Sequence, residues 1–98
     1  MTRAQLQARA RLIASQYGLP PQGFFAQIAQ ESNWDPNAVN AGSGAMGLGQ
    51  FMPATWQEWG QGLSPFDPVA SLDAAARYMR WIRQWLKGQG VSGTWEQA

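Results

Sequence analysis

Apolar residues recur every three or four positions in four segments of this chain, which is the spacing of one face of an α-helix. The first helix is predicted from Thr2, a suitable N-cap, to Tyr17, and Gly18 ends it. Its inner face is formed by Leu6, Ala10, Ile13 and Tyr17. No segment alternates apolar and polar residues as a half-buried strand does, so we expect an all-α fold.

Three further helices are predicted, over residues 21–32, 53–59 and 71–87. Proline begins the first two of these, glycines follow the last two, and residues 64–68 are predicted to form a turn. The longest helix has a core stripe of Leu72, Ala75, Ala76, Met79, Ile82 and Leu86. Beside it lies an aromatic stripe of Tyr78, Trp81 and Trp85, which we interpret as packing against another helix.

The C-terminal residues predict a further helix that the chain does not continue. Residues 94–97 have the capping-box pattern Thr-x-x-Gln, and the sequence ends one residue later. We therefore expect one domain over residues 1–98, truncated at its C-terminus or completed by another chain. The fold class is predicted to be all-α, with no second domain.

The charge pattern does not predict a strongly charged partner. The net charge is +1, and the longest helix carries a basic face of Arg77, Arg80, Arg83 and Lys87. We interpret this face as solvated, or as attracted to an acidic polymer such as the cell wall. No nucleic-acid partner is expected, because no basic run is interleaved with aromatic residues as in a known module.

The chain has no cysteine and no histidine, which excludes thiol nucleophiles, histidine acid–base chemistry and nearly all zinc sites. We expect no metal and no cofactor, so a catalyst here would use carboxylates, hydroxyls, amides or backbone groups. The N-terminal segment does not resemble a secretory signal, and no segment is apolar for long enough to span a membrane.

Residues 33–52 form a predicted loop that is long for so small a domain, which favours a functional role. Gly42, Gly44 and Gly47 match the dinucleotide pattern G-x-G-x-x-G, but this pattern binds nucleotides only after a strand, and none is predicted here. We instead expect the glycines to let the backbone approach a ligand closely, with Gln50 beside Glu31.

Glu31 is the leading candidate for a catalytic acid. It shares a predicted helical face with Phe24 and Ile28, so its carboxyl group is expected to lie half inside the core. A carboxyl group in such a place resists ionisation and can keep a proton near neutral pH. An ordinary glutamate at a helix end, paired with an arginine, is the alternative.

A resemblance to the soluble lytic transglycosylase family lies in ESNWDPNA (31–38) and SGAMGLGQFMPATW (43–56), with further similarity at 67–68 and 74–79. It spans about residues 6–98 and implies a lysozyme-like, goose-type fold. The family cleaves the β-1,4 bond between N-acetylmuramic acid and N-acetylglucosamine in peptidoglycan without water, leaving a 1,6-anhydro product. The resemblance implies that Glu31 is the single acid/base, and that the substrate-binding positions are Ser32, Met46, Gly47, Leu48, Gln50 and Phe51.

The resemblance implies one catalytic carboxylate, whereas ordinary glycosidases use two. The sequence offers few second carboxylates: Asp35, Glu58, Asp67 and Asp73, of which the last two resemble turn or helix-start residues. The alternatives are a hydrolytic muramidase and an inactive, glycan-binding fragment. The implied location is the periplasm or cell wall, for a bacterial or a phage-encoded protein.

Two departures from the family pattern bear on the site. Gly49 stands where the family often has methionine, and we expect it to widen the site slightly. The family's Ala-Tyr-Asn segment, which helps to hold the glutamate and the substrate, would follow Trp95 and Glu96, but the sequence ends at Ala98. We therefore expect a site whose far wall comes from a missing C-terminal segment or from another chain.

Overall fold

The computed structural model describes residues 1–89, which form four α-helices and no named strand. The helices are α1 (Arg3–Gln16), α2 (Pro21–Ser32), α3 (Pro53–Trp59) and α4 (Pro68–Gly88). The all-α prediction is thus confirmed by the described residues. The capping box predicted at residues 94–97 lies outside the described residues.

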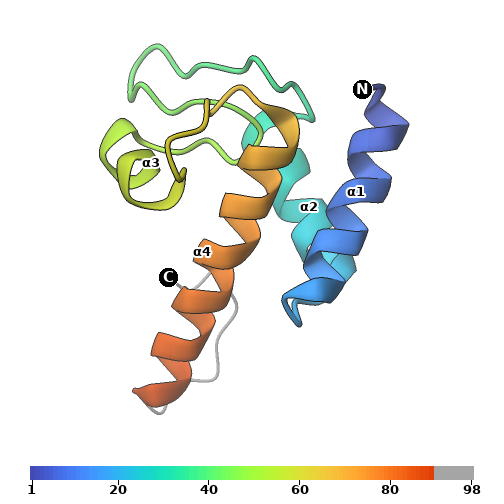
Figure 1. Cartoon of the computed structure of the whole chain (residues 1–98), viewed down its shortest axis with the longest axis vertical. Helices are drawn as coiled ribbons and strands as arrows, with labels where there is room; N and C mark the ends of the chain where they lie inside the picture. Colours follow the sequence, from blue (N-terminus) through green and yellow to red (C-terminus); the bar gives the residue numbers. More distant parts are fainter. Residues whose placement is uncertain (90–98) are drawn as a thin grey trace.

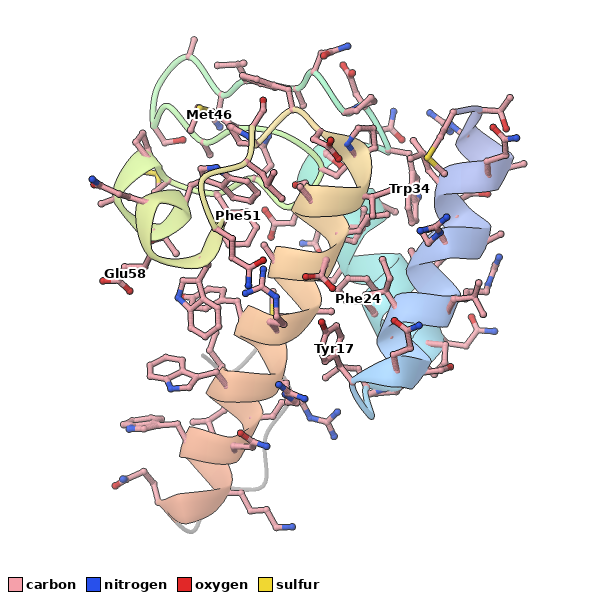
Figure 2. All side chains as sticks on the ribbon, in the orientation of Figure 1. Tyr17, Phe24, Trp34, Met46, Phe51 and Glu58 are labelled. Atoms are coloured by element: carbon pink, nitrogen blue, oxygen red, sulfur yellow. The ribbon has the colours of Figure 1, made fainter. Side chains whose placement is uncertain are left out.

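Helices α1 and α2 lie side by side, and α1 also packs against α4 (Figure 1). Loop residues 33–52 and α3 lie around the N-terminal part of α4, while its C-terminal part extends away from them. Phe24 of α2 is fully buried, and Figure 2 shows its ring between α1, α2 and α4. The other large and fully buried side chains are those of Leu6, Ile28, Leu48 and Leu72.

Local sequence signals account for most helix ends. Thr2 caps α1 through a capping box in which Gln5 N donates to Thr2 Oγ1 (3.1 Å) and Thr2 N donates to Gln5 Oε1 (2.8 Å). Pro21 and Pro53 occupy the first positions of α2 and α3, where a missing N–H costs nothing. The predicted boundaries of these three helices are confirmed to within one residue.

Helix α4 begins three residues earlier than predicted, at Pro68 rather than Ser71. The side chain of Asp67 accepts a hydrogen bond from Ala70 N (2.9 Å) and caps the helix. Pro68 then takes the first helical position. The predicted turn over residues 64–68 therefore ends in a helix start, with Ser71 buried inside the first turns of α4.

A polar network joins α1, α3 and α4. Tyr17 donates its hydroxyl to Asp73 Oδ1 (2.7 Å), beside α4 in Figure 2, and Arg77 Nε donates to Asp73 Oδ2 (2.8 Å). Arg77 Nη2 also donates to the carbonyl of Trp59 at the end of α3 (2.9 Å). Arg77 is thus a partly buried structural residue, and the prediction that it belongs to a solvated basic face is wrong.

Among residues 1–89, no helix has the length and apolar character needed to cross a membrane. The loop residues contribute two isolated β-bridges, Val39 with Met46 and Met46 with Phe51. These bridges fold the glycine-rich segment back on itself. Leu48 and Phe51 of this segment are buried in the core, so the segment is packed against the helices.

Candidate active site

Glu31 lies in the last turn of α2 and is exposed, so the prediction that its carboxyl group lies half inside the core is wrong. The buried stripe of α2 runs from Phe24 to Ile28 and then, four residues on, to Ser32, which is only 8% exposed. Glu31 therefore falls just outside this stripe. Its Oε1 accepts a hydrogen bond from Gln27 Nε2 (2.8 Å), one turn earlier on the same face.

The chain leaves α2 through two consecutive residues in the left-handed region, Asn33 (φ 51°) and Trp34 (φ 62°). Such a conformation is unusual for residues with a side chain and is kept only where surrounding contacts hold it. Trp34 is buried and packs against Phe25, with ring centroids 4.9 Å apart. Arg3 Nη2 donates to the carbonyl of Asn33 (3.0 Å). These contacts end α2 abruptly and place Glu31 at the edge of the fold.

The glycine-rich loop is tied to α4 by its backbone. Gly49 N donates to Ser71 Oγ (3.1 Å), and Ser71 is fully buried. Gly47 has φ 75°, and a Cβ placed there would collide with the carbonyl oxygen of Pro65. Only glycine combines that backbone conformation with so close an approach. The loop therefore has a fixed position against the start of α4.

Gln50 is held by the same loop. Its φ of 51° is left-handed, and its Nε2 donates to the carbonyls of Gly47 (2.9 Å) and Ala38 (3.2 Å). Within residues 1–89, its Oε1 makes no hydrogen bond. This carbonyl oxygen is therefore an acceptor that a ligand's hydroxyl or amide group could use.

A groove of about 200 Å³ lies beside Glu31. Its lining comes from α2, the loop, α3 and α4, and consists of Glu31, Gly49, Gln50, Phe51, Met52, Thr55, Ala75, Tyr78 and Met79. The structure thus brings together three of the predicted site residues, Glu31, Gln50 and Phe51. Glu31 provides the only carboxylate among the described residues that line the groove.

The other four predicted positions do not line this groove. Ser32 donates its hydroxyl to the carbonyl of Ile28 (3.1 Å) within its own helix. Leu48 is fully buried in the core, and Gly47 is buried against Pro65. Met46 is half-buried and pairs through its backbone with Phe51; both residues are labelled in Figure 2. These residues shape the loop and the end of α2 around the groove.

Tyr78 and Met79 of α4 line the groove but were not among the predicted site residues. The Tyr78 ring lies 6.0 Å from that of Phe51 and 5.4 Å from that of Trp59. The one signal for it in the sequence is the aromatic stripe of α4, whose predicted role is helix packing. Its place in the groove depends on how α3 and the loop pack against α4.

Gly49 also lines the groove, but the space beside it is filled. A Cβ placed there would lie 2.7 Å from Cε2 of Phe51 and 3.3 Å from Cβ of Ala75. The prediction that glycine at this position widens the site is therefore wrong, because the Phe51 ring takes up the room. Figure 2 shows Phe51 in this interior position, between the loop and α4.

The remaining carboxylates of the described residues have other surroundings. Asp35 accepts a hydrogen bond from Asn37 N (2.9 Å) in a turn, and Asp67 caps α4. Asp73 is paired with Arg77 and Tyr17. Glu58 is exposed on α3, and Figure 2 places it at the outer edge of the molecule. In the part of the chain that is described, no three metal-ligating side chains lie together.

Comparison with known proteins identifies the family of the chain. The sequence model of the transglycosylase SLT domain matches residues 10–97. A curated relative, membrane-bound lytic murein transglycosylase B of Escherichia coli (strain K12), is 33% identical over 75 residues, covering 69% of this chain. The chain spans about a fifth of that relative's length (20%). No solved structure matches the chain. The match to nearly the whole chain shows that it belongs to the transglycosylase SLT domain family.

Proposed function

We propose that this chain is a lytic transglycosylase that cleaves the β-1,4 bond between N-acetylmuramic acid and N-acetylglucosamine in peptidoglycan. The observation that carries the proposal is the groove, in which Glu31 lies beside Gln50, Phe51 and Tyr78 in a member of the SLT family. The related E. coli protein is named as a lytic murein transglycosylase, which supports the same substrate class.

Among the described residues the groove has one carboxylate, which favours a transglycosylase over a hydrolase. Hydrolytic glycosidases place two carboxyl groups about 5–5.5 Å apart for retention or about 6.5–9.5 Å apart for inversion. Asp35, Asp67 and Asp73 are engaged in a turn, a helix cap and an ion pair, and Glu58 lies outside the groove. One carboxylate is enough when the substrate itself provides the nucleophile.

Glu31 acts first as a general acid and then as a general base. The protonated carboxyl group donates to the glycosidic oxygen, and the bond from C1 of the muramic acid to that oxygen breaks. The substrate's N-acetyl group stabilises the positive charge at C1. The C6 hydroxyl of the same sugar then attacks C1 and gives its proton to Glu31, which closes the 1,6-anhydro ring and restores the acid without consuming water.

Because Glu31 is exposed in the free protein, the bound glycan has to complete its environment. A sugar in the groove covers the carboxyl group and excludes water from it. Gln27 donates to Oε1 and fixes the carboxyl orientation from the solvent side. The Oε1 atom of Gln50 is placed to accept a hydrogen bond from a hydroxyl or N-acetyl group of the substrate.

The test is the release of soluble fragments from purified cell walls by the wild-type chain and by Glu31→Gln. We expect the variant to lose at least about 100-fold in rate, the usual contribution of a general acid. Glu58→Gln is the matched control, since Glu58 is an exposed glutamate outside the groove. Equal rates for the wild type and Glu31→Gln would exclude Glu31 as the catalyst.

Mass spectrometry of the products tests the reaction type. A transglycosylase leaves 1,6-anhydromuramic ends, which are lighter by one water molecule than the reducing ends that a muramidase leaves. Reducing ends would replace our proposal with a hydrolase. The proposed site of action is the periplasm or cell wall, where peptidoglycan is found.

A further inference from the structure

The aromatic stripe of α4 continues outward from the groove. Tyr78, which lines the groove, is nearly parallel to Trp81, with an angle of 11° between the rings and 6.2 Å between their centroids. Trp59 of α3 lies 6.0 Å from Trp81 and supports it from the side. Trp85 follows one turn later on the same side of the helix.

The outer two rings of this stripe are open to solvent. Trp81 is 52% exposed and Trp85 is 55% exposed, so neither is used up by the packing predicted from the sequence. Neighbouring exposed tryptophans are unusual on a protein surface and indicate a site that binds a ligand or a partner protein. From Tyr78 to Trp85 the stripe extends about 10 Å along the helix axis, at about 1.5 Å per residue.

The cations of α4 do not share this surface. Arg83 and Lys87 are each two residues from Trp85, and residues two apart point to different sides of a helix. Arg80 is turned toward α1, where its guanidinium lies 4.8 Å from the centre of the Tyr17 ring. Arg77 is paired with Asp73. The stripe therefore offers flat aromatic surface without positive charge, which suits a neutral ligand better than a nucleic acid, whose binding requires both.

We propose that Tyr78, Trp81 and Trp85 form a sugar-binding track that receives the glycan strand where it leaves the groove. This inference rests on the proposed function. Pyranose rings present apolar C–H faces, and these pack on aromatic rings through dispersion and loss of hydration. The track shares Tyr78 with the groove, so one extended chain of sugars can contact both. Its role is to hold polymeric substrate, while cleavage stays with Glu31.

Binding is tested in the Glu31→Gln background, so that the glycan is not consumed. The probes are peptidoglycan glycan strands freed of their peptides, and chitotriose as a short ligand. Trp81→Ala and Trp85→Ala should each bind the long strands about three- to tenfold more weakly. Chitotriose binding should be unchanged in Trp85→Ala, because a short ligand bound in the groove does not reach Trp85. Trp85→Phe, which keeps an aromatic face, should retain part of the affinity.

Lys87→Ala is the matched control, since Lys87 is exposed in the same turn as Trp85 but on another side of α4. Equal long-strand binding by all variants would overturn the track. So would a loss with Lys87→Ala as large as with the tryptophan variants, or tighter binding of oligothymidine than of glycan, since each indicates an acidic ligand. A tryptophan substitution that changes only the oligomeric state, measured by light scattering, would assign the stripe to a second copy of the chain.

The two proposals can fail separately. Production of anhydro ends by the wild-type chain, with its intact Glu31, reports on the proposed catalysis, whereas long-strand binding in the Glu31→Gln background reports on the track. Weaker long-strand binding by the tryptophan variants, together with no anhydro ends from the wild-type chain, would support the track and refute the enzyme. If the wild type and both tryptophan variants produce anhydro ends from long strands at equal rates, the enzyme is supported and the track is refuted.

Discussion

Two glycines of the same loop provide a test of how the loop is docked. Gly44 (φ 79°) and Gly47 (φ 75°) have nearly the same left-handed backbone conformation. A Cβ at Gly44 would have no atom within 4 Å, whereas a Cβ at Gly47 would collide with the carbonyl oxygen of Pro65 and lie 3.2 Å from Ser71 Oγ. Alanine substitutions at the two positions therefore differ in contact and not in backbone strain.

The expected sizes follow from these surroundings. Gly44→Ala should lower the free energy of unfolding by about 1–2 kcal/mol, the cost of a left-handed conformation for a residue with a Cβ. Gly47→Ala has the same cost and adds about 1–3 kcal/mol for overpacking, because a backbone carbonyl cannot rotate away. In a domain of this size each kcal/mol lowers Tm by about 4–8 °C.

Thermal and urea unfolding followed by circular dichroism measure both variants. We expect the Tm of Gly47→Ala to fall at least twice as far as that of Gly44→Ala. Equal shifts would refute the close approach of Gly47 to Pro65, and with it the docking of the loop against the start of α4. A larger shift for Gly44→Ala would show that Gly44, and not Gly47, is the more closely packed of the two glycines.

Three further predictions concern the helices. Tyr17→Phe removes the hydrogen bond to Asp73, which is the main cause of the raised pKa of Tyr17, with burial second. Because the pKa of Tyr17 is raised in the folded state, the stabilisation by this hydrogen bond is present below about pH 10 and is lost as the pH rises through the folded-state pKa. At neutral pH the free energy of unfolding of the wild type should therefore exceed that of the variant by about 1 kcal/mol. A difference between the two in urea titrations that does not narrow above about pH 10 would contradict this. Phe24→Ala removes a fully buried ring and should lower the free energy of unfolding, measured with urea, by about 3–5 kcal/mol. A smaller loss than for Phe25→Ala, at a half-buried ring, would contradict the position of Phe24 in the core. Thr2→Ala should lower Tm through a loss of about 1 kcal/mol, while Thr55→Ala, which is no cap, tests whether the capping box is the cause.

The helices were predictable because their signals are local. Thr2, Pro21 and Pro53 each act on the turn that they begin, and the structure agrees with all three. The start of α4 was predicted too late because residues 67 and 68, Asp-Pro, are typical both of a turn and of a helix start. Asp67 caps the helix only if the chain before it reaches the right position, which depends on the packing of the preceding turn.

The site was predictable only where a motif carried it. The resemblance gives Phe51, and it strengthens the expectation from the residues themselves that Gln50 lies beside Glu31; all three line one groove. The prediction that Glu31 is partly buried was wrong because Glu31 and Ser32, three and four residues after Ile28, both lie near the same helical face. In the structure Ser32 is the one that is buried. Tyr78 was missed because its neighbours Phe51 and Trp59 are distant in sequence.

The hydrogen bond from Gly49 to Ser71 has a consequence for how the domain folds. It joins the loop to a helix 22 residues further along the chain, and the groove that it helps to close also takes Glu31 from α2. The residues that line the groove are spread from Glu31 to Met79 and come from four segments, α2, the loop, α3 and α4. A cut in the exposed turn at residues 61–64 would place Glu31 on one fragment and Tyr78 on the other. The groove would then exist only while the two fragments are associated.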